Sequence, residues 1–440
     1  MFQHGRTPLG AGGYRLRGRH AGFATSALFA AVLLIAAACS GTTSADVTAA
    51  GEDPDPPASG ATPTTEGGAT DAANIDLDPL KPCLDTLSVE EKVGQLLWVM
   101  TSTPVNVADD AAAGKIGGVG ALEDQGSDIA GQIEVIKDGP RIPMTIASDE
   151  EGGTVQRLDQ VIEPLPSARD TTQKLSTSQT QEMWSNYSAD MVELGFNANF
   201  APVLDVGFGP ALKSRSYALD PEVVSDFATA AAEGMTEGGI TPIAKHFPGI
   251  GYASADPHGE LVQVSNLSEL QRREFLPFRA AIDAGVPAIM TTHAVIPDVT
   301  EGEPVSMSPA GVALLRDDLG FSGLIVTDSL IMGAIADERS QSEAAVQALV
   351  AGNDVALIAG AQNVDEVHSA MVAAVAGGTL TEERLDESVN RVLDFKQVTG
   401  SCAAGDEQPS ASTTAAPTTT AATGTTLLER DPVAGGDPTG

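Results

Sequence analysis

Short runs of apolar and β-branched residues recur along the chain, and each run is entered from a Gly/Pro turn. Runs of this length and composition are typical of buried β-strands. The stretches between them are longer and carry helical patterns. The eight runs span residues 94–100, 116–122, 143–148, 196–202, 241–246, 287–293, 323–328 and 354–359. We therefore expect eight strands that alternate with helices.

Two of the intervening stretches carry clear helix signals. Ser88 and Glu91 have the spacing of a capping box, which marks the start of a helix. Residues 268–285 are amphipathic and end at a glycine, so we expect a helix over this range. In a further predicted helix, His368 falls on the polar side, and we expect it at the surface.

Eight strand–helix repeats favour a parallel sheet with right-handed crossovers. The most economical α/β fold of this kind is a closed (β/α)8 barrel of the TIM type. An open doubly wound sheet is the alternative, but no GxGxxG or P-loop motif follows an early run. The sequence thus predicts a single (β/α)8 barrel.

The two ends of the chain differ in composition from the part between them. Residues 1–38 start with several arginines and continue as an apolar, small-residue stretch, which predicts an export signal. Residues 39–76 and 403–440 are rich in Gly, Thr, Ala and Pro without apolar periodicity, and we expect both to be disordered. The folded domain is therefore expected over residues 77–402.

Cys39 directly follows the small-residue run, in the sequence IAAAC. This resembles the lipobox of bacterial lipoproteins, which implies that Cys39 is lipidated. A plainly cleaved signal and an uncleaved anchor are the alternatives. Lipidation implies a protein of the cell envelope, held on the extracytoplasmic face of the membrane.

The chain is strongly acidic, with 60 Asp and Glu residues against 24 Lys and Arg and a formal net charge of −36. This balance argues against a nucleic-acid-binding protein, which needs a cationic face. It also argues against adhesion of the folded body to an anionic membrane. We therefore expect contact with the membrane through the lipid anchor only.

The three cysteines are not at zinc-ligand spacing, and we expect no metal site. Cys83 and Cys402 lie at the two edges of the expected domain. In an oxidising compartment they can form a disulfide, and two free thiols are the alternative.

Polar residues stand at the C-terminal ends of several apolar runs. Asp149, Lys245, His246, His293 and Asp328 each lie at the end of a run or one residue beyond it. In a (β/α)8 barrel these ends share one rim, and active sites are built there. We therefore expect these side chains to converge.

The residues on this rim suit a retaining glycosidase. Such an enzyme needs an ionised carboxylate to attack the anomeric carbon and a protonated group to expel the leaving sugar. Asp328 is the candidate carboxylate, with a helix N-cap as the alternative. His258 lies two residues from Asp256 in a Gly/Ser-rich loop, which suits a proton shuttle oriented by a carboxylate. A solvent-exposed loop histidine is the alternative for His258.

A family resemblance rests on five segments: SDEEGGTVQRL (148–158), NFAPVLDV (199–206), KSRSYALDPE (213–222), AKHFPGIGYASADPHGE (244–260) and IVTDSLIMGAI (325–335). Together they resemble glycoside hydrolase family 3, and most closely its single-domain β-N-acetylhexosaminidases, over residues 85–398. The resemblance implies a (β/α)8 barrel with Asp328 as nucleophile and the Asp256–His258 pair as general acid/base. No metal or organic cofactor is required, because a carboxylate and an imidazole carry the chemistry.

The resemblance also assigns five residues to the glycone pocket: Asp149, Arg157, Arg215, Lys245 and His246. A structural ion-pair network at the barrel mouth is the alternative for this set. Glu151 and Asp205 lie in the same motifs, and we expect structural roles for both. His293 matches a family position near the site, and a satisfied core histidine is an equally reasonable interpretation.

Two positions depart from the family pattern. Ile250 stands where the family usually has a second histidine in KHFPGHG, and Pro257 replaces the usual serine inside the Asp–His dyad. Proline fixes its own φ and restricts the residue before it, so we expect a stiffer dyad. Neither change removes a reacting group.

These observations together predict a retaining exo-β-N-acetylglucosaminidase, a monomer that removes terminal GlcNAc from peptidoglycan fragments (muropeptides). Phosphorolysis is the nearest competing reaction, because a histidine acid/base does not repel phosphate. Three more functions stay open: a β-glucosidase, a non-catalytic wall-binding lipoprotein, and a substrate-assisted hydrolase that uses the Asp149–Glu150 dipeptide.

Overall fold

The computed structural model of the protein describes residues 81–257, 259–398 and 402. Several predictions lie outside these residues: the export signal (1–38), the linker (39–76), the tail (403–440), Cys39 and His258. No helix in the described part of the chain is long and apolar enough to cross a membrane.

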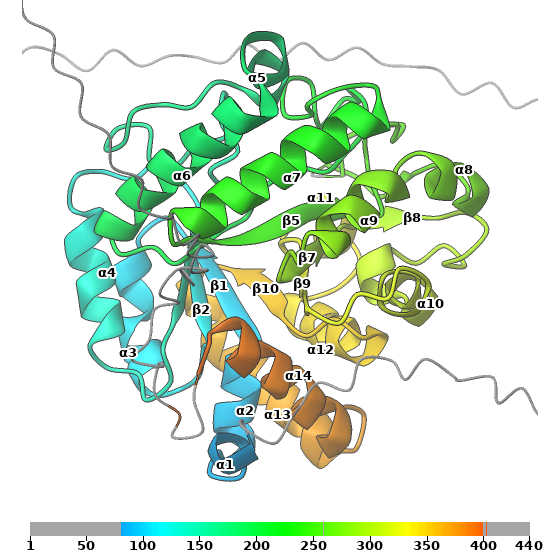
Figure 1. Ribbon diagram of the computed structural model, residues 1–440. Coiled ribbons are helices and arrows are strands. Elements are labelled where there is room, and N and C mark those ends of the chain that lie inside the picture. The colour runs from blue at the N-terminus through cyan, green and yellow to red at the C-terminus, as the bar shows by residue number, and fades with distance from the viewer. Residues whose placement is uncertain (1–80, 258, 399–401, 403–440) are drawn as a thin grey trace, which may run out of the picture. The chain divides into compact units, whose positions relative to one another are not determined.

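Eight parallel strands form the centre of the structure (Figure 1). Their bounds are β1 Leu97–Thr101, β2 Gly118–Ala121, β3 Thr145–Ser148, β4 Ala198–Asn199, β5 Thr241–Phe247, β7 Ala288–Thr291, β9 Leu324–Thr327 and β10 Ala356–Ala359. Neighbours follow the order β10-β1-β2-β3-β4-β5-β7-β9, and a single bridge between Val326 and Val355 brings β9 against β10. The eight predicted strands and the predicted α/β barrel are therefore confirmed, and the barrel is nearly closed.

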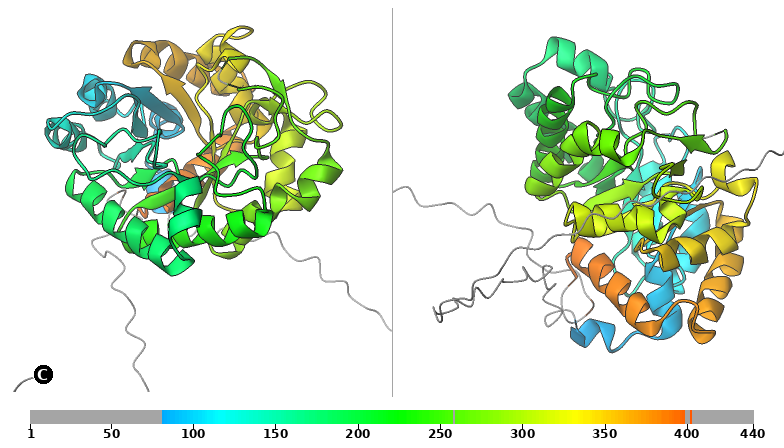
Figure 2. Two further views of the ribbon diagram at one scale, coloured as in Figure 1. Left: turned by 90° about the horizontal axis from the view of Figure 1, so that it is seen from above. Right: turned by 90° about the vertical axis from the view of Figure 1, so that its right-hand side faces the viewer.

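Helices surround the strands, as the view from above shows (Figure 2). Their bounds are α1 Lys81–Leu84, α2 Val89–Gln95, α3 Ala108–Ala112, α4 Ile129–Lys137, α5 Ala168–Lys174, α6 Thr177–Glu193, α7 Pro221–Glu237, α8 Leu267–Arg272, α9 Phe275–Asp283, α10 Pro309–Ala313, α11 Gly333–Ala336, α12 Gln341–Ala351, α13 Val364–Ala376 and α14 Glu382–Phe395. Two further short strands, β6 Val262–Gln263 and β8 Ala294–Val295, pair in parallel outside the barrel sheet. The strand residues of β1, β2, β3, β7, β9 and β10 are all buried and form the core.

The predicted capping box begins α2. The Ser88 hydroxyl accepts a hydrogen bond from Glu91 N at 3.2 Å, and the Glu91 carboxylate accepts one from Ser88 N at 2.9 Å. These bonds satisfy two backbone N–H groups that the first helical turn leaves without partners.

The single helix predicted over 268–285 is wrong, because the structure has two helices there, α8 and α9. Arg273 separates them with backbone angles outside the helical region. Pro277 lies one turn later and has no N–H to bond the Arg273 carbonyl, so a continuous helix would lose a hydrogen bond at this point. The break turns Glu274 inward, where it is buried.

The surface position expected for His368 is also wrong. Its side chain is buried, and its Nε2 lies 3.0 Å from the carbonyl oxygen of Glu90, beside α2. The polar face of α13 that carries His368 is therefore covered by α2, which the periodicity of α13 alone does not reveal.

The two ends of the described domain are joined covalently. Cys83 in α1 and Cys402 form a disulfide, with their Cα atoms 4.9 Å apart and a sequence separation of 319. Both cysteines are buried.

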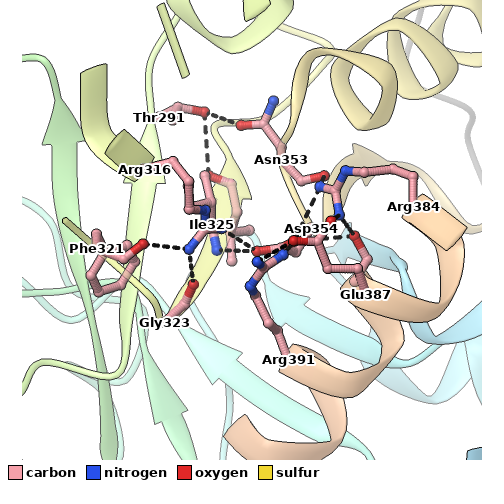
Figure 3. A network of polar contacts seen from close by, with 12 residues as sticks. Thr291, Arg316, Phe321, Gly323, Ile325, Asn353, Asp354, Arg384, Glu387 and Arg391 are labelled. Atoms are coloured by element: carbon pink, nitrogen blue, oxygen red, sulfur yellow. Dashed lines mark hydrogen bonds and ion pairs between the residues drawn. The ribbon is translucent and has the colours of Figure 1, made fainter. Parts of the chain in front are cut away.

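A buried ion cluster holds the seam where β9 meets β10 (Figure 3). Asp354 lies just before β10 and is fully buried, and its carboxylate receives hydrogen bonds from three arginines: Arg316 at 2.9 Å, Arg384 at 3.1 Å and Arg391 at 3.0 Å. It also accepts from the backbone N of Ile325 in β9. Burial alone would raise the pKa of Asp354, but the three guanidinium groups hold it below its usual value. The cluster therefore ties α14 and the segment before β9 to the point where the sheet closes.

We expect Asp354→Asn to lower the free energy of unfolding by about 3–5 kcal/mol, because it leaves three buried or half-buried arginines without their shared counter-charge. Urea unfolding at pH 7 measures the loss. Glu387→Gln is the matched control, because Glu387 pairs with Arg391 but its side chain is 48% exposed, so its loss costs about 1 kcal/mol or less. Equal losses in the two variants would contradict the assignment of the seam to Asp354.

Candidate active site

The mouth of the barrel is organised around one buried carboxylate, that of Glu151. Lys245, near the end of β5, places its Nζ 2.7 Å from Glu151 Oε1 and 2.6 Å from Asp149 Oδ1. Arg215, on the loop after β4, donates to both Glu151 oxygens, at 2.6 and 2.8 Å. Two predicted pocket cations from different parts of the chain thus meet on one acid.

The electrostatics of this group follow from its pairing. Burial alone would raise the pKa of Glu151, but Arg215 and Lys245 hold it far below its usual range. Burial would likewise lower the pKa values of Lys245 and Arg215, and the neighbouring carboxylates raise both instead. All three groups therefore stay charged at neutral pH. The structural role expected for Glu151 agrees with these contacts.

His246 is held between a carboxylate and a cation. Its Nδ1 lies 2.6 Å from Asp205 Oδ2, and its Nε2 lies 3.2 Å from Arg215 Nη2. A guanidinium only donates hydrogen bonds, so Nε2 of His246 accepts and Nδ1 donates to Asp205. The second Asp205 oxygen accepts from the backbone N of Ile250 at 2.7 Å. Asp205 therefore joins His246 to the loop that follows β5.

An irregularity in β5 explains how Lys245 and His246 reach the same cluster. Successive side chains of a regular strand point to opposite faces. The pairing of β5 with β7 shifts register between Ala244 and Phe247, which is the stretch that contains both residues. Such a shift re-aims side chains, and it lets two consecutive residues contribute to the mouth.

Glu150, between Asp149 and Glu151, has a different environment from either. Its buried carboxylate accepts from the Ser148 hydroxyl at 2.5 Å, the Tyr187 hydroxyl at 2.8 Å and the backbone N of Arg157 at 3.0 Å. Because burial is not offset by a cation, the pKa of Glu150 is raised to about 7. Asp149 and Glu150 thus have different partners, which does not favour the pairing that a substrate-assisted hydrolase would use.

Two residues to which the sequence assigned no role hold this segment, although Asn199 begins the motif at 199–206. Asn199, in β4, accepts from Glu150 N at 3.0 Å and donates to Glu150 O at 2.9 Å. Tyr187, in α6, donates to the Glu150 side chain and accepts from Gln156. Their positions in an apolar run and in a helix gave no signal of this function.

Arg157 is fixed through its backbone and keeps its guanidinium available. Its N donates to Glu150, and its carbonyl accepts from Gln125 N at 2.7 Å. No other residue in the described ranges forms a hydrogen bond or ion pair with the guanidinium, and its buried Nε has no partner there. A guanidinium has five N–H donors, so this group is suited to bind a ligand with several oxygen atoms.

Asp328 lies at the C-terminal end of β9 and is half-buried. Its N donates to Thr291 O at 2.8 Å, and its Oδ1 accepts from Ser329 N at 2.8 Å. The next helix, α11, begins only at Gly333 with Met332 as its N-cap, so Asp328 is not a helix cap. The alternative interpretation of Asp328 is therefore wrong.

His293 supports the backbone beside Asp328. Its Nδ1 lies 2.7 Å from the Ser306 hydroxyl, and its Nε2 lies 3.1 Å from the carbonyl oxygen of Ser329. A carbonyl oxygen only accepts, so Nε2 donates. The histidine is fully buried and bonded, in agreement with the core interpretation.

The loop after β5 carries Asp256, which is half-buried, and it packs closely on the loop after β4. A Cβ atom added at Gly251 would lie 1.6 Å from the carbonyl oxygen of Val206, so only glycine fits there. Ile250, where the family usually has histidine, is buried and binds Asp205 through its backbone. The departure at this position therefore leaves the anchor of the loop intact.

All predicted site residues that the structure describes lie at the same end of the barrel. Asp149, Arg215, Lys245 and His246 form one connected cluster around Glu151, whereas Arg157, Asp256 and Asp328 lie on the segments that follow β3, β5 and β9. Within the described ranges, no group of three or more His, Cys, Asp or Glu side chains is arranged to hold a metal ion.

Comparison with known proteins identifies relatives along most of the chain. Residues 88–395 match the family described as glycosyl hydrolase family 3 N terminal domain. The beta-hexosaminidase LpqI of Mycobacterium tuberculosis is 32% identical over 364 residues, which cover 78% of this chain and 94% of that protein. A beta-N-acetylglucosaminidase/beta-glucosidase of Cellulomonas fimi is 29% identical over 339 residues, or 73% of this chain and 59% of that protein.

Solved structures agree. The structure of M. tuberculosis LpqI superposes with a TM-score of 0.70 at 32% identity, covering 72% of this chain and 96% of that one. A beta-N-acetylhexosaminidase from Beutenbergia cavernae superposes with a TM-score of 0.66 at 27% identity, covering 71% of this chain and 99% of that one.

The raised pKa of Glu150 predicts a specific pH dependence of stability. Between pH 4.5 and about 7 the folded state holds a proton that the unfolded chain has released, so the free energy of unfolding falls as pH rises through this window. We expect Glu150→Gln to reduce the difference in unfolding free energy between pH 5 and pH 8 by roughly 2–3 kcal/mol. Urea unfolding at both pH values measures it.

Glu163→Gln is the matched control, because Glu163 is an exposed glutamate close by in the sequence. We expect it to keep the pH dependence of the wild type. A Glu150→Gln variant with an unchanged pH dependence would show that Glu150 does not carry this proton.

Proposed function

Because the chain belongs to glycosyl hydrolase family 3, we propose that it is a retaining exo-β-N-acetylglucosaminidase that removes terminal β-linked GlcNAc through a covalent glycosyl-aspartate. The observation that carries the proposal is the mouth cluster around Glu151. It presents fixed hydrogen-bonding groups at the C-terminal end of the barrel strands, the end at which Asp328 follows β9. The names of the relatives, beta-hexosaminidase and beta-N-acetylglucosaminidase, support GlcNAc as the sugar.

The glycone is bound by the groups of the mouth. Asp149 accepts hydrogen bonds from ring hydroxyls, while Lys245, Arg215, His246 and Arg157 supply polar contacts around it. The pairing of Lys245 and Arg215 with Glu151 fixes their positions before the sugar arrives, so little is lost to reorganisation on binding.

The first chemical step breaks the glycosidic bond. An Asp328 carboxylate oxygen forms a bond to the anomeric carbon, and the electron pair of the broken bond goes to the glycosidic oxygen. That oxygen takes a proton from His258, which Asp256 orients. Water then gives its proton back to His258 and attacks the same carbon, which releases GlcNAc with retained configuration and frees Asp328.

The cell location is proposed from the sequence. The arginine-rich start and the IAAAC sequence support lipidation at Cys39 and attachment to the extracytoplasmic face of the membrane. In that location the available β-linked GlcNAc belongs to peptidoglycan fragments, and these are the proposed substrates. Phosphorolysis is the second candidate reaction, supported by the Asp256-Pro257-His258 sequence, because a histidine does not repel phosphate as a carboxylate would.

A panel of aryl β-glycosides of GlcNAc, GalNAc, glucose and xylose, with and without phosphate, tests the specificity. We expect the highest kcat/KM for GlcNAc, because four polar groups and Arg157 can bind both hydroxyls and the acetamido group. We expect free GlcNAc as the product at every phosphate concentration. A preference for glucose would overturn the GlcNAc assignment, and GlcNAc 1-phosphate would establish the phosphorylase.

A second prediction concerns the nucleophile. We expect Asp328→Ala to lower kcat at least about 1,000-fold while the melting temperature stays close to that of the wild type. Asp317→Ala, at an exposed aspartate before β9, is the control and should keep full activity. A 5-fluoro or 2-deoxy-2-fluoro inactivator should label the peptide that contains Asp328, and NMR should show retention in the first-formed anomer. Labelling of another acidic residue, or inversion of the anomeric configuration, would contradict the proposed mechanism.

A further inference from the structure

One aromatic side chain at the mouth has no structural explanation. Tyr252 is 45% exposed and is the one large aromatic residue among the strongly exposed hydrophobic side chains of the described chain. It stands on the loop after β5, four residues before Asp256. A single exposed ring is common on protein surfaces, so its exposure alone indicates no ligand. A ring that is fixed on the loop of a proposed acid/base residue offers a ligand a rigid apolar surface.

The ring of Tyr252 is held in place by its neighbours. The guanidinium carbon of Arg273 lies 3.7 Å from the ring centroid, which covers one face of the ring with a cation. Arg273 is itself fixed, because its Nε donates to the buried Glu274 carboxylate at 2.9 Å and its Nη2 donates to Ser265 at 3.2 Å. Arg273 comes from the corner between α8 and α9. On the loop after β4, a Cβ atom built at Gly207 would lie 2.9 Å from Tyr252 Cε2, so the ring also packs against this glycine, and the rest of the ring is exposed.

The backbone around Tyr252 is also fixed. Ile250 N donates to Asp205, which binds His246 in the mouth cluster. The Gly251 carbonyl accepts from Gly209 N at 3.0 Å, and Ala253 N donates to Ile250 O at 3.0 Å. Tyr252 therefore lies two residues from a direct contact with the mouth cluster, and its position is defined before any ligand binds.

The place of Tyr252 on the loop indicates which part of the substrate it meets. In the proposed reaction the proton donor lies beside the glycosidic oxygen, which joins the terminal sugar to the leaving sugar. The loop that carries Asp256 must therefore lie along the leaving-sugar side. A second exposed apolar residue, Ile331, follows Asp328 by three positions and is 52% exposed.

We propose that the exposed part of the Tyr252 ring is the binding platform for the leaving saccharide, which stacks the apolar C–H face of its ring on the tyrosine. This inference rests on the proposed function, because it takes Asp256 as part of the proton donor. The platform acts in the step that expels the leaving sugar and has no contact with the sugar that stays on Asp328. It would make the enzyme prefer a saccharide over a small leaving group.

Substrates that differ only in the leaving group test this proposal. N,N′-diacetylchitobiose and the GlcNAc–MurNAc disaccharide have a leaving sugar to stack, whereas β-GlcNAc fluoride has none. We expect Tyr252→Ala to lower kcat/KM for the disaccharides about five- to tenfold, and to change kcat/KM for the fluoride less than about twofold. The parameter kcat/KM is the right readout, because it reports the step in which the leaving group departs.

Two variants control the comparison. Tyr252→Phe keeps the ring and should retain wild-type values for all substrates. Val135→Ala removes apolar surface from a 54% exposed residue of α4, which is distant in sequence from the residues of the mouth. We expect it to leave kcat/KM unchanged for all substrates. Activity of Tyr252→Ala on the fluoride also shows that the variant is folded.

Two outcomes would overturn the platform. Equal losses of kcat/KM on the fluoride and the disaccharides would show that Tyr252 supports the fold or contacts the glycone. Unchanged kcat/KM values on all substrates would show that Tyr252 contacts no sugar. Failure of the proposed function is a separate result, because wild-type enzyme would then cleave neither type of GlcNAc donor. In that case the Tyr252 variants are compared on the glycosyl fluoride and the disaccharide of the sugar that the wild-type enzyme prefers.

Discussion

Two cations, Lys245 of β5 and Arg215 of the loop after β4, meet on the buried carboxylate of Glu151, and the arrangement of the barrel mouth depends on this contact. Lys245 reaches from Glu151 to Asp149, and Arg215 reaches from Glu151 to His246. The hydrogen bonds and ion pairs in this cluster are short. A change in the position of Glu151 would therefore displace the side chains of Lys245 and Arg215 and the groups that they contact. The charges are costly to bury singly and stable only together. The glycone groups are thus positioned by their pairing with one another before substrate arrives.

A buried carboxylate is also paired with several cations at the opposite end of the strands, near the seam between β9 and β10. Asp354 receives three arginines where β9 and β10 are joined by a single bridge. The chain has only 24 basic residues against 60 acidic ones. Six of the basic ones pair with buried acids: Lys245 and Arg215 at the mouth, the three arginines at Asp354, and Arg273 at Glu274. Part of the small number of basic residues is therefore used to neutralise buried carboxylates. The acidic residues that exceed the basic ones in number lie elsewhere in the chain.

Much of this architecture follows from the sequence. Apolar runs bounded by turns gave all eight strands, and the polar residues at their ends gave the rim, because both depend on local composition and on one rule of barrel geometry. The register shift in β5 and the separate environment of Glu150 could not be predicted. They depend on what packs against Lys245, His246 and Glu150, and neither leaves a periodic pattern. The helix break at Arg273 could have been predicted, because Pro277 is visible in the sequence. The amphipathic pattern across 268–285 favoured one continuous helix instead.

The disulfide between Cys83 and Cys402 has a topological consequence. With these residues bonded, the chain between them forms a closed covalent ring that contains every strand of the barrel. A single proteolytic cut in any loop within the ring opens it but leaves both fragments attached to each other. A nicked molecule therefore stays one molecule until it is reduced, and its two pieces remain at a high effective concentration for re-association.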